Sequence, residues 1–236
     1  MARQAVESQD EFLSLIAHEL RAPLSVIRAY LSMLAEGTLG PPPEAWAAPL
    51  QVLTEKVGEL DSLVDDVLFS ARLESGLLTY EPQTVDLLES AQEAARLAAA
   101  RAQLLHATIE VEGSSAPAWA DVRLLARILA NLLDNALIYS AAAPEVRLLV
   151  SDGEAPAVRV ADRGLGIPAE EQGRVFEKGY RILRPQLDVP GTGLGLYISR
   201  QLAERMGGGL ELERSEPGPG SVFRLRLPRP GPRDPG

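Results

Sequence analysis

The chain has 236 residues, of which 46% are hydrophobic and 24% charged, and its formal net charge is -10. This composition excludes wholesale disorder, and the acidic balance argues against nucleic acid as a partner. Cysteine is absent and only two histidines occur, which excludes disulfides, thiolate zinc sites and multi-histidine metal sites. No apolar run reaches the roughly 18 residues of a membrane helix. No apolar segment follows Met1 either, so we expect a cytoplasmic protein whose membrane attachment, if any, comes from segments outside this sequence.

The first third of the chain has the pattern of two amphipathic helices. In residues 11–35, apolar side chains recur at alternating steps of three and four, and a second such seam runs from residue 44 to Ala71. Residues 37–43 contain two glycines and three consecutive prolines, which stop a helix. We therefore expect an antiparallel hairpin. Because one hairpin of about 65 residues cannot bury both seams, the pattern favours a homodimer that forms a four-helix bundle.

Strand and helix patterns mix after Gly76. Strand character occurs in residues 78–86, 107–111, 145–150 and 156–161, helical character in residues 87–105, 121–139 and 194–206, and a closing hairpin in residues 210–212 and 221–227. Without strict strand–helix–strand alternation, this mixture favours an α+β sandwich. We expect a dimerisation domain in residues 1–76, a second domain in 77–228 and a flexible tail in 229–236. Residues 228–236, with four prolines and two glycines, are expected to be frayed.

His18 belongs to a polar stripe on the first helix. The stripe consists of Glu11, Ser14, His18, Arg21, Ser25 and Arg28. We therefore expect His18 to face solvent, where one imidazole nitrogen is free near neutral pH, with Glu19 placed to hold the ring or take its proton. Pro23 lacks an N–H, so the Glu19 carbonyl loses its helical partner and the helix is expected to bend or loosen. By itself, such a pattern more often reflects a solvated histidine beside a chance proline.

Two patterns in the second domain suit a ligand that carries phosphate and an amine. Asn131 and Asn135 lie four residues apart on one helix face, and amide oxygens suit Mg²⁺ held together with phosphates. Asp162 follows a strand and precedes Gly164 and Gly166, so its carboxylate can accept from an exocyclic amine such as that of adenine. Taken singly, the first pattern is more often a polar patch or helix end, and the second an ordinary turn.

A third pattern, in residues 191–196, places three glycines at the start of a helix. Exposed N–H groups and the positive end of the helix dipole attract phosphate there. The spacing matches neither a Walker A loop nor the dinucleotide-binding fingerprint. A glycine-rich turn is weak evidence alone, so the order of all these patterns along the chain decides the interpretation.

In that order the patterns resemble the sensor histidine kinases of two-component systems over nearly the whole chain. The resemblance rests on an H-box in residues 12–24, an N-box in 131–140, a G1-box in 162–166, an F-box in 175–178 and a G2-box in 191–196. It implies a helical dimerisation domain followed by an α/β-sandwich ATPase domain of the kind shared with gyrase and Hsp90-type chaperones.

The resemblance also implies roles for individual residues, with ATP and Mg²⁺ as cofactors. His18 is implied as the phosphoacceptor and Glu19 as the acidic partner that activates it. Asn135, with Asn131, is implied to hold Mg²⁺ against the ATP phosphates. The implied nucleotide-binding residues are Asn131, Asn135, Tyr139, Asp162, Gly164, Gly166, Phe176, Arg181, Gly191, Thr192, Gly193, Leu194, Gly195 and Leu196. Among these, Asp162 binds the adenine amine and Phe176 anchors a mobile lid over residues 179–190.

Several positions depart from the family pattern. Ile138 stands where the N-box usually has lysine, and Gly179 stands where the F-box usually has a second aromatic residue, so both bear on ATP affinity. Ala22 replaces a common threonine or asparagine, and Ala17 replaces a frequent serine. His106 matches no motif, and we expect it to be an exposed structural residue.

The resulting hypothesis is an ATP-dependent autokinase that phosphorylates His18 and passes the phosphoryl group to an aspartate of a response regulator. Phosphatase activity is expected to be weak, because Ala22 has no hydroxyl or amide to orient a water molecule. One alternative is a non-catalytic dimeric scaffold of the same fold. The unusual residues Ile138 and Gly179 favour this alternative, because both bear on ATP affinity. The other is an ATP-driven conformational machine of the same superfamily, which has no need of an exposed His-Glu pair on a bundle helix.

Overall fold

The computed structural model describes residues 2–140, 143–182 and 192–231, and the side chains of residues 2–14, 17 and 18 lie outside that description. The chain divides into two units, Met1–Thr79 with Pro190–Leu194 and Tyr80–Val189 with Gly195–Gly236. Among the described helices, none is long and apolar enough to span a bilayer.

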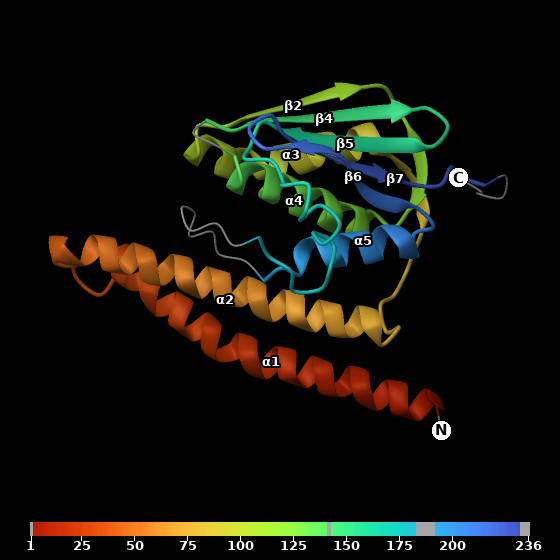
Figure 1. Ribbon diagram of the computed structural model, residues 1–236. Helices are drawn as coiled ribbons and strands as arrows, with labels where there is room; N and C mark the ends of the chain where they lie inside the picture. Colours follow the sequence, from red (N-terminus) through yellow and green to blue (C-terminus); the bar gives the residue numbers. More distant parts are fainter. Residues whose placement is uncertain (1, 141–142, 183–191, 232–236) are drawn as a thin grey trace. The chain divides into compact units, whose positions relative to one another are not determined.

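The first unit is a hairpin of α1 (Ala2–Ala35) and α2 (Ala47–Glu74), which run antiparallel as predicted (Figure 1). Their connection includes the short 3₁₀ helix η1 (Glu44–Trp46). Gly37 and Gly40 take positive φ angles of 74° and 107° in this connection. Three prolines follow, so neither helix can continue through it.

The first helix differs from its predicted form in where it begins. It begins at Ala2 rather than near residue 11, because residues 2–10 include alanine, arginine, glutamine and glutamate but neither glycine nor proline. It also continues through Pro23. This agrees with the helical pattern predicted over residues 11–35, and the bend or loosening expected from the missing hydrogen bond to the Glu19 carbonyl stays a prediction.

Much of the apolar seam of the hairpin is exposed in the single chain. On α1, Leu20, Ile27 and Tyr30 are 44%, 46% and 59% exposed, whereas Leu24 and Leu31 are buried. The exposed apolar side chains of the second seam include Trp46, Leu53, Leu60 and Val67. The hairpin therefore presents a strip of apolar side chains that it does not cover by itself.

The second unit is built around a five-stranded sheet with the strand order β2-β4-β5-β7-β6. The strands are β2 (Thr108–Gly113), β4 (Glu145–Asp152), β5 (Pro156–Asp162), β6 (Gly209–Glu216) and β7 (Gly220–Arg226). The β2–β4 pair is parallel, and the other neighbouring strands are antiparallel. The pairing of β6 with β7 confirms the predicted closing hairpin.

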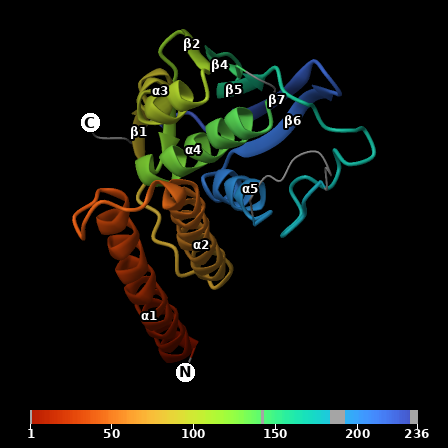
Figure 2. The same cartoon turned by 90° about the vertical axis from the view of Figure 1, so that its left-hand side faces the viewer.

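Three helices cover one face of this sheet: α3 (Leu87–Leu104), α4 (Val122–Ile138) and α5 (Gly195–Arg205) (Figures 1 and 2). Residues of β4 alternate between exposed and buried, with Val146, Leu148 and Val150 in the core. The buried face of α4 is continuous from Leu124 to Leu137. The alternation confirms the predicted α+β sandwich, because one sheet face packs on helices and the other meets solvent.

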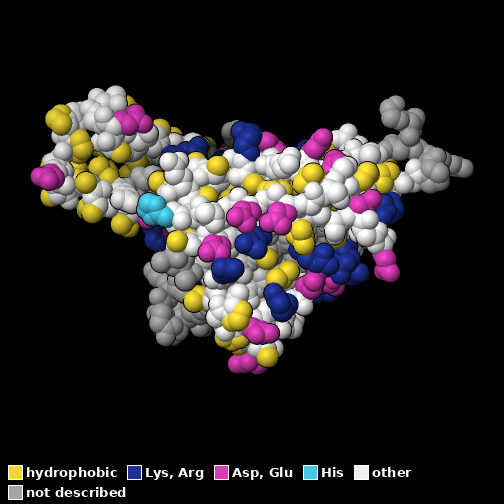
Figure 3. Space-filling model, turned by 90° about the horizontal axis from the view of Figure 1, so that it is seen from above, with side chains coloured by type: hydrophobic (Ala, Val, Ile, Leu, Met, Phe, Trp, Pro, Cys, Tyr) yellow, Lys and Arg dark blue, Asp and Glu magenta, His cyan; other side chains and the backbone are white. Residues whose placement is uncertain are grey.

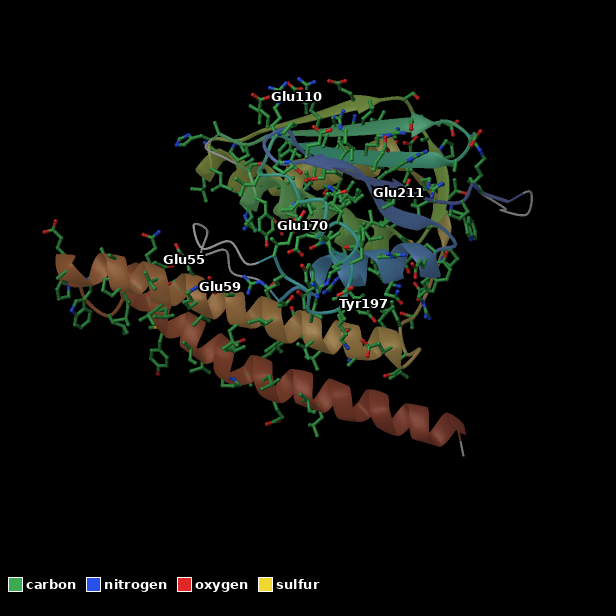
Figure 4. All side chains as sticks on the ribbon, viewed as in Figure 1. Glu55, Glu59, Glu110, Glu170, Tyr197 and Glu211 are labelled. Carbon is green, nitrogen blue, oxygen red and sulfur yellow. The ribbon has the colours of Figure 1, made fainter. Side chains whose placement is uncertain are left out.

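The solvent face of the sheet carries ion pairs between strands. Arg147 lies 3.1 Å from Glu110 of β2, and Arg159 lies 2.7 Å from Glu213 of β6. Figure 4 labels Glu110 and Glu211, which belong to this set. Figure 3 shows acidic and basic side chains interspersed on the face that it presents. Charged residues therefore occupy the alternate strand positions whose side chains point away from the apolar core.

A separate two-stranded sheet pairs β1 (Gln83–Asp86) with β3 (Pro117–Ala120). The strand predicted over residues 78–86 is therefore confined to its last four residues. We did not predict β3, because Pro-Ala-Trp-Ala contains no β-branched residue and is only four residues long. Its pairing depends on β1, some 30 residues earlier in the chain.

The start of the predicted flexible tail is held by the fold. The Trp119 N–H donates to the Pro228 carbonyl at 2.8 Å, and Arg229 lies 2.7 Å from Asp152. Pro228 and Arg229 thus have partners in the fold, and the flexible tail over residues 229–236 stays a prediction. Residues 232–236 of that segment lie outside the described residues.

His106 follows the end of α3 in the left-handed region, with a φ of 53°, and it is exposed as predicted. We expect His106→Gly to raise the free energy of unfolding by roughly 0.5 kcal/mol, because glycine relieves this strain but gains flexibility in the unfolded chain. Urea denaturation measures the change. His106→Ala keeps the strain and is the matched control, so equal stability of the two variants would contradict the explanation.

Candidate functional site

Three of the predicted residues of the second unit, Tyr139, Asp162 and Gly164, meet where β5 ends beside the C-terminal end of α4. Asp162 is the last residue of β5, and Tyr139 caps α4. The Leu165 N–H donates to the Tyr139 carbonyl at 3.0 Å, and Ser140 forms an isolated bridge with Gly164. The N-box and G1-box segments are thus joined through their backbones.

The Asp162 carboxylate is held through one of its two oxygens. Oδ1 accepts the Gly164 N–H at 2.8 Å and the Ser221 N–H at 3.2 Å. No described residue hydrogen-bonds to Oδ2, which leaves that oxygen for a ligand. Burial raises the pKa of Asp162, and the two backbone donors oppose that rise.

Close backbone contacts explain the two glycines that follow Asp162. A side chain at Gly164 would lie 2.5 Å from the Tyr139 carbonyl oxygen and 2.7 Å from Asp162 Oδ1. Gly166 has a φ of 64°, and a Cβ there would overlap the carbonyl of Glu216. Both glycines therefore allow this loop to pack directly on its neighbours.

Two buried serines of the closing hairpin belong to this site and were missed in the sequence. Ser221 supplies the second N–H to Asp162, and its hydroxyl lies 2.8 Å from that of Ser215. Ser215 Oγ also accepts the Ile167 N–H at 2.8 Å. The sequence did contain a signal. Ser221 occupies an inward position of β7, where the alternating pattern predicts an apolar residue.

Asn131 and Asn135 are both half-buried on α4, but their surroundings differ. Asn131 Nδ2 donates to Ser199 Oγ of α5 at 2.9 Å, and its Oδ1 lies against Gly195, where a Cβ would overlap it. Asn131 therefore joins α4 to the first turn of α5. No described residue hydrogen-bonds to the side chain of Asn135, which leaves its amide oxygen open to a cation.

The described part of the G2-box consists of Thr192, Gly193, Leu194, Gly195 and Leu196. Thr192 Oγ1 accepts the Leu194 N–H at 2.9 Å, which closes a turn immediately before α5. The helix begins at Gly195, so its first N–H groups have no helical acceptor. Gly191, the first glycine of the motif, lies outside the described residues.

Phe176 of the F-box packs against β7 and α5. Its ring meets that of Phe223 edge to face, with 6.2 Å between the ring centroids. The guanidinium carbon of Arg200 lies 5.3 Å from the centroid of the Phe176 ring. Lys178 lies 6.0 Å from the ring of Tyr197, which Figure 4 labels on α5. These contacts hold the F-box against β7 and α5. Residues 183–190 of the predicted lid lie outside the described residues. Arg181 is exposed.

The hairpin carries the remaining predicted residues. His18 lies within α1, and its side chain is outside the described part of the structure. Glu19 is exposed on the next position. Pro23 follows one turn later in the same continuous helix.

Two family models match the chain. The model described as "His Kinase A (phospho-acceptor) domain" matches residues 8–76. The model described as "Histidine kinase-, DNA gyrase B-, and HSP90-like ATPase" matches residues 120–231.

Curated relatives resemble nearly the whole chain. The signal transduction histidine-protein kinase/phosphatase MprB of Mycobacterium sp. (strain KMS) is 34% identical over 240 residues, which cover 97% of this chain and 46% of the relative. The alginate biosynthesis sensor protein KinB of Pseudomonas aeruginosa is 30% identical over 93% of this chain and 37% of its own length. The chain thus spans less than half the length of these relatives.

Solved structures of histidine kinases are also similar to this chain. Full-length ShkA in complex with AMPPNP is 29% identical, with a TM-score of 0.73 over 93% of this chain and 46% of that protein. The mycobacterial sensor histidine kinase MprB, also 29% identical, has a TM-score of 0.55 over 65% of this chain and all of that structure.

Proposed function

We propose that this chain, which belongs to the sensor histidine kinases and contains their catalytic core, phosphorylates its own His18 from ATP and passes the phosphoryl group to an aspartate of a response regulator. The observation that carries the proposal is the position of Asp162, which lies beside the C-terminal end of α4 and accepts an N–H near the start of β7. In the same unit, the first N–H groups of α5 have no helical acceptor and can bind phosphate. The complex of the related ShkA with AMPPNP supports nucleotide binding as part of this proposal.

Adenine is proposed to lie against Asp162. Its exocyclic amine would donate to Oδ2, the oxygen that the backbone N–H groups leave available. Gly164 and Gly166 form the adjoining wall without side chains. Tyr139, which is 37% exposed at the end of α4, and the exposed Arg181 would line the nucleotide from the N-box and F-box.

The triphosphate is proposed to lie against the G2-box. Its negative charge would be stabilised by the first N–H groups of α5 and the glycines before them. Phe176, held by Phe223 and Arg200, would anchor the lid that closes over the nucleotide.

The oxygen donors on α4 fit a magnesium ion bound with the phosphates. Asn135 would contribute its amide oxygen, and Asn131 would approach from one turn earlier while its nitrogen holds Ser199. When bound, Mg²⁺ neutralises phosphate charge in the transition state. The α4–α5 contact would keep both asparagines aligned with the helix N-terminus.

His18 and Glu19 are proposed to perform the transfer. A neutral imidazole nitrogen of His18 attacks the γ-phosphorus, the bond to the bridging oxygen breaks, and ADP leaves. Glu19 orients the ring and accepts or shares its proton. A carboxylate of the response regulator then attacks the phosphohistidine and releases the imidazole.

A homodimer is proposed from the exposed strips on both helices. Leu20, Ile27 and Tyr30 on α1, with Leu53 and Leu60 on α2, remain exposed in one chain. A second hairpin would cover them in a four-helix bundle.

The test is incubation with γ-labelled Mg·ATP followed by acid and alkali treatment. The autokinase predicts label that acid removes and alkali spares. A non-catalytic scaffold predicts no label, and an ATP-driven machine predicts ADP release without label, so either result would replace the proposal.

Asn135→Ala is expected to weaken ATP binding in magnesium by roughly 10- to 100-fold, because a direct oxygen ligand is lost. Titration of ATP with magnesium and with EDTA measures this. In EDTA the variant and the wild type are expected to bind ATP equally. A variant that keeps the full magnesium effect would remove Asn135 from the metal site.

The phosphatase reaction is expected to be weak. Ala22 is exposed one turn after His18, and a methyl group cannot orient water for attack on the regulator phosphate. Ala22→Thr is expected to restore part of the activity, measured as decay of the phosphorylated regulator with ADP. Strong wild-type acceleration that is insensitive to changes at Arg21 and Ser25 would contradict the hydroxyl argument. The MprB relatives, which are named kinase/phosphatases, provide a positive control.

A further inference from the structure

Two ion pairs join the helices of the hairpin on the side of the polar stripe. Arg21 donates from both Nε and Nη2 to Asp65 Oδ1, at 3.1 and 2.7 Å. Two helical turns further along α1, Arg28 Nη1 donates to Asp61 Oδ2 at 2.9 Å. All four residues lie on the hairpin, so these contacts depend only on the packing of α1 against α2.

The two pairs lie on opposite sides of Pro23. Arg21 precedes the proline by two residues, and Arg28 follows it by five. Since Pro23 has no N–H, the Glu19 carbonyl has no helical partner one turn later, so the helix lacks one backbone hydrogen bond between the two pairs. The Arg28–Asp61 pair holds the half after the proline, whereas Arg21–Asp65 holds the half that carries His18.

The exposure of these side chains indicates what such a pair can do. Arg21 and Asp65 are both about half exposed, and ion pairs of that kind contribute little to global stability. A forked contact on one carboxylate oxygen can still fix the angle of a helical segment that lacks one backbone hydrogen bond. Arg21 lies three residues after His18, almost one turn away on the same stripe.

We propose that Arg21 and Asp65 are positioning residues, which hold the His18 segment of α1 against α2 ahead of Pro23 and thereby set the attack geometry of His18. This inference rests on the proposed function of His18 as phosphoacceptor. Neither residue contacts the reacting atoms in this proposal. Their effect acts through the direction of the helix.

Charge reversal provides the test. Arg21→Asp and Asp65→Arg are each expected to lower the rate of autophosphorylation at saturating Mg·ATP by roughly tenfold, because ångström-scale misplacement of a reacting group costs up to about 100-fold. The KM for ATP is expected to stay within about twofold. The double variant restores the pair with its charges exchanged and is expected to recover most of the rate.

The matched control is the pair beyond the proline. Arg28→Asp and Asp61→Arg remove a similar ion pair. We expect them to change the rate of autophosphorylation by less than about twofold, because the His18 segment keeps the Arg21–Asp65 ion pair. A rate that stays low in the Arg21/Asp65 double variant would overturn the proposal. So would an equal loss of rate in the control pair.

A second measurement does not depend on catalysis. Hydrogen exchange of the amides in residues 15–22 is expected to accelerate in Arg21→Asp and Asp65→Arg and to recover in the double variant, while residues 24–35 stay unchanged. If the wild type took up no label, the proposed function would fail, but the exchange result would still decide whether the pair holds this segment. Unchanged exchange in both single variants would overturn the positioning role.

Discussion

His18→Ala is expected to abolish autophosphorylation completely while leaving nucleotide affinity unchanged. Alanine has no nucleophile, and the protein has no cysteine and only one other histidine to take its place. Asp162 and the two asparagines of α4 belong to the other unit, so we expect the truncation of His18 to leave them unchanged. The measurement pairs acid-labile label from γ-labelled ATP with an ADP titration of the same sample.

The matched control for this variant is His106→Ala, which removes the other histidine at an exposed position after α3. It is expected to retain full labelling. Acid-labile label that persists in His18→Ala would move the phosphosite elsewhere. Loss of ADP binding in the same variant would mean that the two functions are not separable.

Asp162→Asn is expected to weaken ATP and ADP binding alike. An asparagine can keep its Oδ1 on the Gly164 and Ser221 N–H groups, which places its NH₂ where Oδ2 stood. That donor faces the adenine amine instead of accepting from it. The expected loss is roughly 1.5–3 kcal/mol, the value of a hydrogen bond to a charged group, or about 10- to 150-fold in Kd.

The same substitution is expected to make the unliganded protein more stable at neutral pH. Because burial raises the pKa of Asp162, the folded protein holds this proton more tightly than the unfolded chain. Its contribution to stability is therefore present at low pH and is lost as pH rises from the unfolded pKa through the raised folded one. Asp162→Asn has no such loss, so its Tm is expected to exceed that of the wild type at pH 7 and to approach it near pH 3.

Asp134→Asn is the control for the effect on nucleotide binding. Burial also raises the pKa of Asp134, but its carboxylate pairs with Arg101 of α3 at 2.7 Å. We expect nucleotide binding to be kept in this variant. If Asp162→Asn spared ADP binding, adenine would have to lie elsewhere.

The sequence by itself determined the parts of this protein that depend on neighbouring residues. Heptad spacing and a proline-rich break predicted the hairpin, because helix periodicity and helix termination are local properties. The order of the five boxes identified the family, and alternation predicted β4, β5 and the β6–β7 hairpin. The extra turns before residue 11 and the strand at 117–120 were missed, because neither carries a strong periodic signal.

Only the tertiary structure decided which distant residues meet. Ser221 reaches Asp162 across 59 positions, and Asn131 reaches Ser199 across 68. Arg21 pairs with Asp65 across 44 positions on the facing helix. Such contacts depend on strand order, register and helix packing, which are set by burial of the whole core rather than by any short segment. For that reason the serines beside Asp162 and the ion pair ahead of Pro23 became visible only in the folded chain.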